Sequence, residues 1–220
     1  RHDPALPQTP RSVKQDLGDR GMTSSLRHAK QLFLTSTRVQ DDRSAMRNSL
    51  VSALGTRNLP VYAASPQVSE RSRSEFRASF EGLLRAQAIL HREGESEQRH
   101  NEAISAIAIQ LSASHGAVLR EGRMRIGVVQ KALNLYFKFR WCLDESFPTP
   151  HHCPIDGIVL RAAGSNGKWT ELDDLETYCI WIDQVRAKII QHDFTSLPEW
   201  ELEVWQRGRT GRTTPQTGCR

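Results

Sequence analysis

The chain has 220 residues, which is enough for one domain with a hydrophobic core that needs no disulfide or metal for stability. Hydrophobic residues make up 38% of it and charged residues 25%, and the formal net charge is +5. We expect no membrane insertion, because no apolar run approaches the roughly 18 residues that cross a bilayer, whereas the positive charge is compatible with a polyanionic partner such as DNA.

Two ends of the chain differ in composition from the part between them. Residues 1–22 and 207–220 are basic, contain prolines or glycines, and show no helical periodicity, so they are predicted to be a flexible arm and a flexible tail. Between them, apolar residues recur at steps of three and four, which predicts a single all-α domain over 23–206 with about seven to eight helices. The expected helices cover 25–38, 42–55 after a cap at Asp41 and Asp42, 69–92, 95–114, 126–143, 173–191 and 197–206. We find no convincing strand and no internal repeat.

The segment 126–143 is apolar on nearly every side, so this helix is expected at the centre of the domain. Its apolar residues include Val129, Leu133, Tyr136, Phe137 and Trp141. The preceding segment, 115–127, contains three glycines and is predicted to be a turn.

The connection after this helix, PTPHHCPIDGIVL (148–160), concentrates the residues that carry chemistry. Pro154 is suited to the first position of a helix, which would place Asp156 two or three positions inside it, close to free backbone N–H groups. The simplest interpretation of Asp156 is a capping acid. Lys131, near the start of the apolar helix, either extends to solvent or lies in a cleft with a lowered pKa, where its amine can act as a nucleophile.

The segments Gly127-Val128-Val129-Gln130-Lys131-Ala132 and Pro154-Ile155-Asp156-Gly157-Ile158-Val159 resemble the helix-hairpin-helix DNA glycosylases, nearest the archaeal 8-oxoguanine branch. The resemblance covers residues 122–162. In that family a GVG-x-K segment opens a helix and a later (V/I)D-x-x-V segment carries an aspartate. The sequence departs from the pattern in three ways. Val129 replaces the hairpin's second glycine, Gly157 follows the aspartate, and the separation of 25 positions (156 − 131) between Lys131 and Asp156 is longer than in most members, with FPTPHH filling the difference.

The resemblance implies a DNA-binding base-excision enzyme of DNA repair, with glycosylase (hydrolase) and AP lyase activity and no cofactor. Lys131 would attack C1′ of a damaged nucleotide to form a Schiff base, and Asp156 would support the charge that develops on the sugar. Such an enzyme holds its flipped base between apolar walls. Trp141, Phe147 and Trp169 would supply those walls, His151 and His152 would contact phosphate or the base, and Gly127 would contact the substrate from the hairpin. Ordinary core packing of the aromatic residues and a solvated loop for the histidines remain the alternatives.

Other functions compete for the same connection. Cys142, His151, His152 and Cys153 offer zinc ligands, with Cys179 or His192 to complete a site, but they lack the paired short spacings of structural zinc sites, so no metal is predicted. No G-x-S-x-G motif indicates a hydrolase of the serine type. The main alternative is a non-enzymatic helical binding or adaptor protein, for instance in bacterial defence or stress, in which this connection is a rigid corner.

The four cysteines, Cys142, Cys153, Cys179 and Cys219, form no CxxC pair, and no secretory apolar segment opens the sequence. These features predict a reduced, cytoplasmic protein.

Overall fold

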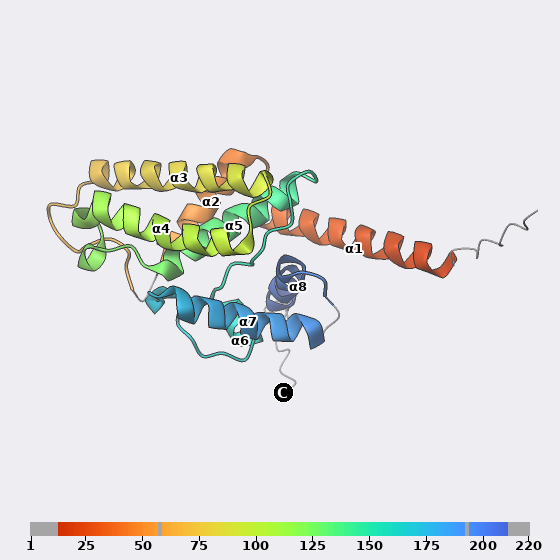
Figure 1. The fold of residues 1–220 in the computed structure, drawn as a ribbon. Helices are drawn as coiled ribbons and strands as arrows, with labels where there is room; N and C mark the ends of the chain where they lie inside the picture. The colour runs from red at the N-terminus through yellow and green to blue at the C-terminus, as the bar shows by residue number, and fades with distance from the viewer. Residues whose placement is uncertain (1–12, 57–58, 192–193, 211–220) are drawn as a thin grey trace, which may run out of the picture.

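Helix α5 (Ile126–Leu143) lies at the centre of an all-α domain, as its composition predicted (Figure 1). The computed structural model describes residues 13–56, 59–191 and 194–210. The helices in these ranges are α1 (Val13–Thr37), α2 (Asp42–Leu54), α3 (Glu70–Arg92), α4 (Glu97–His115), α5, α6 (Gly157–Ala162), α7 (Leu175–Gln191) and α8 (Leu197–Thr210), with the short 3-10 helices η1 (Gly116–Val118), η2 (Arg120–Gly122) and η3 (Trp169–Glu171).

The helices form two groups around α5. Helices α3 and α4 lie side by side on one side of the molecule, with α2 next to them, whereas α6 and α7 lie on the opposite side (Figure 1). Helix α8 packs against α1, α6 and α7, and the first half of α1 extends away from the body of the molecule. In the described ranges the only β pairing is an isolated bridge between Tyr62 and Leu119, so the expectation of a strand-free fold is confirmed there.

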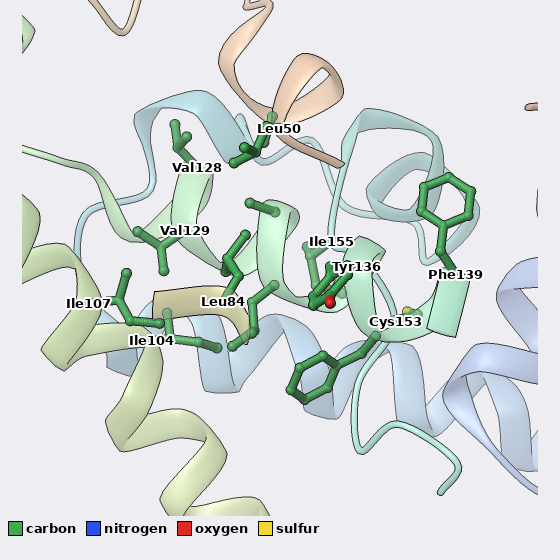
Figure 2. Packing of buried hydrophobic residues seen from close by; sticks show 14 of the residues in the cluster. Leu50, Leu84, Ile104, Ile107, Val128, Val129, Tyr136, Phe139, Cys153 and Ile155 are labelled. Carbon is green, nitrogen blue, oxygen red and sulfur yellow. The ribbon is translucent and has the colours of Figure 1, made fainter. Parts of the chain in front are cut away.

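The core is built around α5, most of whose apolar side chains are buried (Figure 2). Leu84 from α3 and Ile104 and Ile107 from α4 pack with Val129 and its neighbours on one side. From the 144–156 connection, Cys153 and Ile155 enter the same core and are fully buried. Burying a large apolar side chain contributes about 1.5–3 kcal/mol, so this connection is anchored by its own apolar residues.

Most helix starts were predicted correctly because their capping residues are visible in the sequence. Asp41 accepts a hydrogen bond from the Ser44 backbone N–H in a capping box, and Ser69 and Ser96 cap α3 and α4 in the same way. Asp42 then joins three helices, since its carboxylate accepts hydrogen bonds from Tyr136 (2.7 Å) and Arg140 (2.8 Å) of α5 and from Arg85 of α3.

The expected boundaries of the ends need correction. Helix α1 begins at Val13, inside the stretch predicted to be a flexible arm, and α8 continues to Thr210 rather than ending at 206. Once a helix is nucleated, each added residue gains a backbone hydrogen bond at little cost, so a helix can extend past the last periodic apolar residue. The remainder of the predicted arm and tail, 1–12 and 211–220, lies outside the described residues. Among the helices that are described, none is long and apolar enough to cross a bilayer.

Candidate active site

Lys131 and Asp156 lie together. The Lys131 Nζ is 3.6 Å from an Asp156 carboxylate oxygen, Oδ2, with 11% of the lysine side chain and 24% of the aspartate side chain exposed. The two residues come from the first half of α5 and from the start of α6, and a long connection separates them in the chain. The structure therefore forms one ammonium/carboxylate pair from the two residues that the sequence singled out.

The residues next to this pair explain how it is held. Gln130 is fully buried, and its side-chain amide pairs with the backbone of Ile155: Nε2 donates to the carbonyl (2.7 Å) and Oε1 accepts from the N–H (3.1 Å). This double hydrogen bond fixes Ile155 beside Gln130, so the next residues along each segment, Asp156 and Lys131, face one another. Gln130 was missed from the sequence; a fully polar amide in an otherwise apolar helix is the signal that would have indicated a buried partner.

Asp156 is the N-cap of α6, not a residue two or three positions inside a helix as predicted. Its Oδ1 accepts hydrogen bonds from the backbone N–H groups of Ile158 (2.9 Å) and Val159 (3.2 Å). Pro154 is buried and lies before α6, so it does not take the first helical position that the sequence predicted. The two carboxylate oxygens therefore have separate tasks: Oδ1 caps α6 and Oδ2 faces Lys131.

Burial lowers the pKa of Lys131 from its ordinary value of 10.5, and the negative charge of Asp156 opposes this change. The Trp169 ring of η3 covers the ammonium at 4.2 Å from its centroid, a cation–π contact. Desolvation of this kind increases the fraction of neutral amine, which is the nucleophilic form of lysine.

A cavity of about 270 Å³ opens beside the pair, close to the lower end of the roughly 300–1,000 Å³ typical of small-ligand pockets. Its walls combine aromatic and aliphatic side chains with hydrogen-bonding groups, which come from α1, α2, α5, α8 and the residues before α6. They are Phe33, Thr37, Asn48, Ser52, Lys131, Leu135, Lys138, Phe139, Pro154, Asp156, Glu201 and Trp205.

A second ammonium/carboxylate pair lines the same cavity. Lys138 of α5 donates to Glu201 of α8, and the two side chains are only 1% and 9% exposed. The Lys138 Nζ also lies 3.8 Å from the centroid of the Phe33 ring, and burial raises the pKa of Glu201. The two lysines and two carboxylates offset one another in formal charge, so the lining itself is not a basic surface.

Gly127 packs against η3 and does not face the cavity. Its N–H donates to the Leu172 carbonyl (2.9 Å), and a Cβ at this position would lie 1.7 Å from the Trp169 carbonyl oxygen. Glycine is therefore required for the close approach of α5 to η3, which in turn places the Trp169 ring over Lys131. Its N–H has no free capacity for a DNA phosphate.

The structure does not bring the predicted histidines to the Lys131/Asp156 pair. His152 is fully buried between Tyr178 (2.7 Å) and Glu97 (3.0 Å), and His151 bonds the Glu95 carbonyl at 2.7 Å. Both rings make edge-on or tilted contacts with His91 or His100 in a cluster that joins the 144–153 connection to α3 and α4. Burial lowers the pKa of His100 to about 3 and also lowers the pKa values of His91 and His152, so these rings are neutral packing groups near neutral pH.

Of the predicted aromatic walls, only Trp169 contacts Lys131. Trp141 is 4% exposed and lies under a different lysine, Lys30, whose Nζ is 3.6 Å from the ring centroid. Phe147 is 2% exposed and packs between Phe137 and His91. None of the three predicted wall residues, Trp169 included, lines the cavity.

No group of three or more His, Cys, Asp or Glu side chains in the described ranges is arranged to hold a metal ion. Cys142, Cys153 and Cys179 are free thiols, and burial raises the pKa of each. His192, considered as a further ligand, and Cys219 lie outside the described residues.

Comparison of the chain with protein-family models, with curated proteins and with solved structures finds no match in any of the three. Arguments about function therefore depend on the geometry of the site.

Proposed function

We propose that the protein is a DNA base-excision enzyme of the glycosylase/AP lyase type, in which Lys131 is the nucleophile and Asp156 the carboxylate partner. The observation that carries the proposal is the 3.6 Å separation of the two groups at the wall of a cavity, with a lysine pKa lowered by burial. A lysine whose pKa is lowered by burial has a larger fraction of neutral, nucleophilic amine than an exposed lysine, and it needs no cofactor to act as a nucleophile.

The chemistry follows from these two groups. The neutral Lys131 amine attacks C1′ of the target nucleotide while the glycosidic C1′–N bond breaks, and the base leaves and takes up a proton. Asp156 stabilises the positive charge on the sugar during this step and accepts the proton that the new secondary ammonium loses. The nitrogen lone pair then expels O4′, which takes up the proton held by Asp156, and the open-chain sugar is left as a protonated C1′=N Schiff base. Loss of a C2′ proton to the Asp156 carboxylate forms the C2′=C3′ bond and expels the 3′ phosphate, and water then hydrolyses the C=N bond and releases the sugar from Lys131.

A second candidate is a non-enzymatic helical binding or adaptor protein, and the start of α5 favours it. The N–H of Gly127 is used by Leu172, and the His-Cys-Pro connection is held internally by His152 and Ile155, as a rigid corner would be. In this function the Lys131/Asp156 pair would only join α5 to α6.

Borohydride trapping distinguishes the two functions. The full chain is incubated with oligonucleotides that contain uracil, 8-oxoguanine or an abasic site, and sodium borohydride reduces any Schiff base to a stable amine. We expect a covalent adduct with the wild-type chain and none with Lys131→Gln.

Lys30→Gln is the matched control. Burial lowers the pKa of Lys30 as well, but its ammonium lies on Trp141 and does not line the cavity. Lys30→Gln should form the adduct at the wild-type level. An adduct that persists in Lys131→Gln, or no adduct with any of the three substrates, would rule out the base-excision function and leave the adaptor.

A further inference from the structure

Helices α2 and α3 border a groove that the base-excision proposal does not use. It has a volume of about 710 Å³ and an apolar floor that includes Leu54, Tyr62 and Val51, which is 66% exposed. Arg43 and Arg47 of α2 stand along its edge, and within the described part of the chain neither makes an ion pair. Arg77 and Glu81 of α3 also line it, each in an ion pair with a neighbour on α3. Positive charge therefore exceeds negative charge around an apolar centre, the type of surface that accepts an amphipathic helix.

The outer face of α7 has the complementary properties. Glu176, Ile180, Asp183 and Ala187 recur at steps of three and four and are all exposed, so they lie on one side of the helix. Ile180 is 50% exposed, and Ile190, at the edge of the same face, is 76% exposed. This face is therefore acidic, and two isoleucines on it remain exposed to solvent. Single exposed apolar residues are common on protein surfaces, so the isoleucines matter here only in combination with the acidic residues.

The two surfaces cannot meet within one molecule, because α2 and α3 lie on the opposite side of the domain from α7 (Figure 1). Their dimensions are compatible, since α7 is about 25 Å long and α2 about 20 Å. Asp183 forms an ion pair with Arg186 (3.2 Å). An exposed pair of this type is weak, so Asp183 can give up Arg186 and pair with an arginine of the groove instead.

We propose that the outer face of α7 docks into the α2/α3 groove of a second copy of this chain. Ile180 enters the apolar floor near Val51, while Glu176 and Asp183 approach Arg43 and Arg47. The contact is head-to-tail, so a dimer still has one free groove, on one copy, and one free α7 face, on the other, and assembly continues to longer species as the concentration rises. The proposal is independent of the base-excision function.

Sedimentation velocity tests this contact with two variants of the full chain. The groove variant carries Arg43→Gln, Arg47→Gln and Val51→Gln, and the helix variant carries Ile180→Gln and Asp183→Asn. The wild type should sediment faster as its concentration rises from low to high micromolar, and added salt should reduce this increase. Each variant alone should remain monomeric, with a helix content by circular dichroism equal to that of the wild type.

Mixing the two variants gives the decisive measurement. The groove variant retains an intact α7 face and the helix variant an intact groove, so an equimolar mixture should form one-to-one dimers and nothing larger. Ile109→Gln, which replaces an exposed isoleucine of α4 outside both surfaces, should assemble as the wild type does. A wild type that stays monomeric at every concentration, or a mixture that stays monomeric while the wild type assembles, overturns the proposal, and so does a groove variant that still assembles.

Discussion

The two ammonium/carboxylate pairs on α5 differ mainly in burial. Lys131 and Lys138 are about two turns apart on one face of the helix, and both line the same cavity. The Lys138/Glu201 pair is sealed between α5 and α8, at 1% and 9% exposure, whereas the Lys131/Asp156 pair is 11% and 24% exposed. The same two kinds of charged group therefore form an almost fully buried contact in one place and a partly exposed contact in the other.

Under the proposed function, this difference separates a structural pair from a reactive one. A buried charge is stable only with its partner, so Lys138 and Glu201 depend on each other for folding. Asp156 instead divides its oxygens between the α6 cap and Lys131, and the ammonium has the Trp169 ring as a second neighbour. The first pair should consequently respond to mutation through stability, and the second through reactivity.

The largest expected effect is the loss of one member of the sealed pair. Glu201→Gln leaves the Lys138 ammonium buried without a countercharge, and we expect the free energy of unfolding to fall by about 3–5 kcal/mol. Urea denaturation followed by circular dichroism measures this change. Replacing both residues by apolar ones, Lys138→Met with Glu201→Leu, should recover most of the loss.

Glu203→Gln is the control for that comparison. Glu203 lies on the same helix, its side chain is 36% exposed, and its partner is Arg207, so its replacement should cost less than about 1 kcal/mol. If Glu201→Gln and Glu203→Gln lowered the free energy of unfolding equally, burial would not explain how much each ion pair contributes to stability.

An intermediate effect is expected at Asp156, where two substitutions separate its two tasks. Asp156→Ala removes the cap of α6 and should lower the free energy of unfolding by roughly 0.5–2 kcal/mol. Asp156→Asn keeps an oxygen that accepts the Ile158 and Val159 N–H groups, so its stability should be within about 0.5 kcal/mol of the wild type. The Asn variant nevertheless lacks the charge that faces Lys131, and its rate of adduct formation should fall by roughly 10²–10⁴-fold.

The same denaturation and borohydride measurements decide this case. If Asp156→Asn traps DNA as fast as the wild type, the carboxylate charge has no part in the chemistry. If it is as unstable as Asp156→Ala, the amide does not cap α6.

The sequence was sufficient to predict the all-α fold, the central position of α5 and most helix starts. These features depend on local signals: apolar periodicity, and caps such as Asp41, Ser69 and Ser96 within a few residues of the helices they begin. The proximity of Lys131 and Asp156 followed from a resemblance, and it agrees with the distance between them.

What the sequence did not reveal depends on contacts between remote segments. Glu201 stands between Trp200 and Leu202 in an amphipathic helix, and only the packing of α8 on α5 shows that it meets Lys138. A lysine in the most apolar helix of the chain was a signal for such a partner, although it could not identify which acid. The histidines of the 148–160 connection were expected near the substrate because nothing in the sequence places His91 and His100 beside them.

The smallest expected effect is on the pH dependence of stability, which reports the lowered pKa of Lys131. The folded state binds the lysine proton less tightly than the unfolded chain, whose lysine has the ordinary value of 10.5. Between the folded-state pKa and 10.5 the unfolded state therefore holds more protons, and stability rises with pH in this window. Lys131→Met lacks the titrating group, so the free energy of unfolding of the wild type should increase relative to this variant as pH approaches 10.5. Denaturation of both proteins from pH 7 to 10 measures the difference, with the exposed Lys168→Met as a control for the loss of one positive charge.

A difference in the free energy of unfolding that decreases with pH would mean that the charge of Asp156 outweighs burial. Lys131 would then stay protonated, and the basis for its nucleophilic role would be removed.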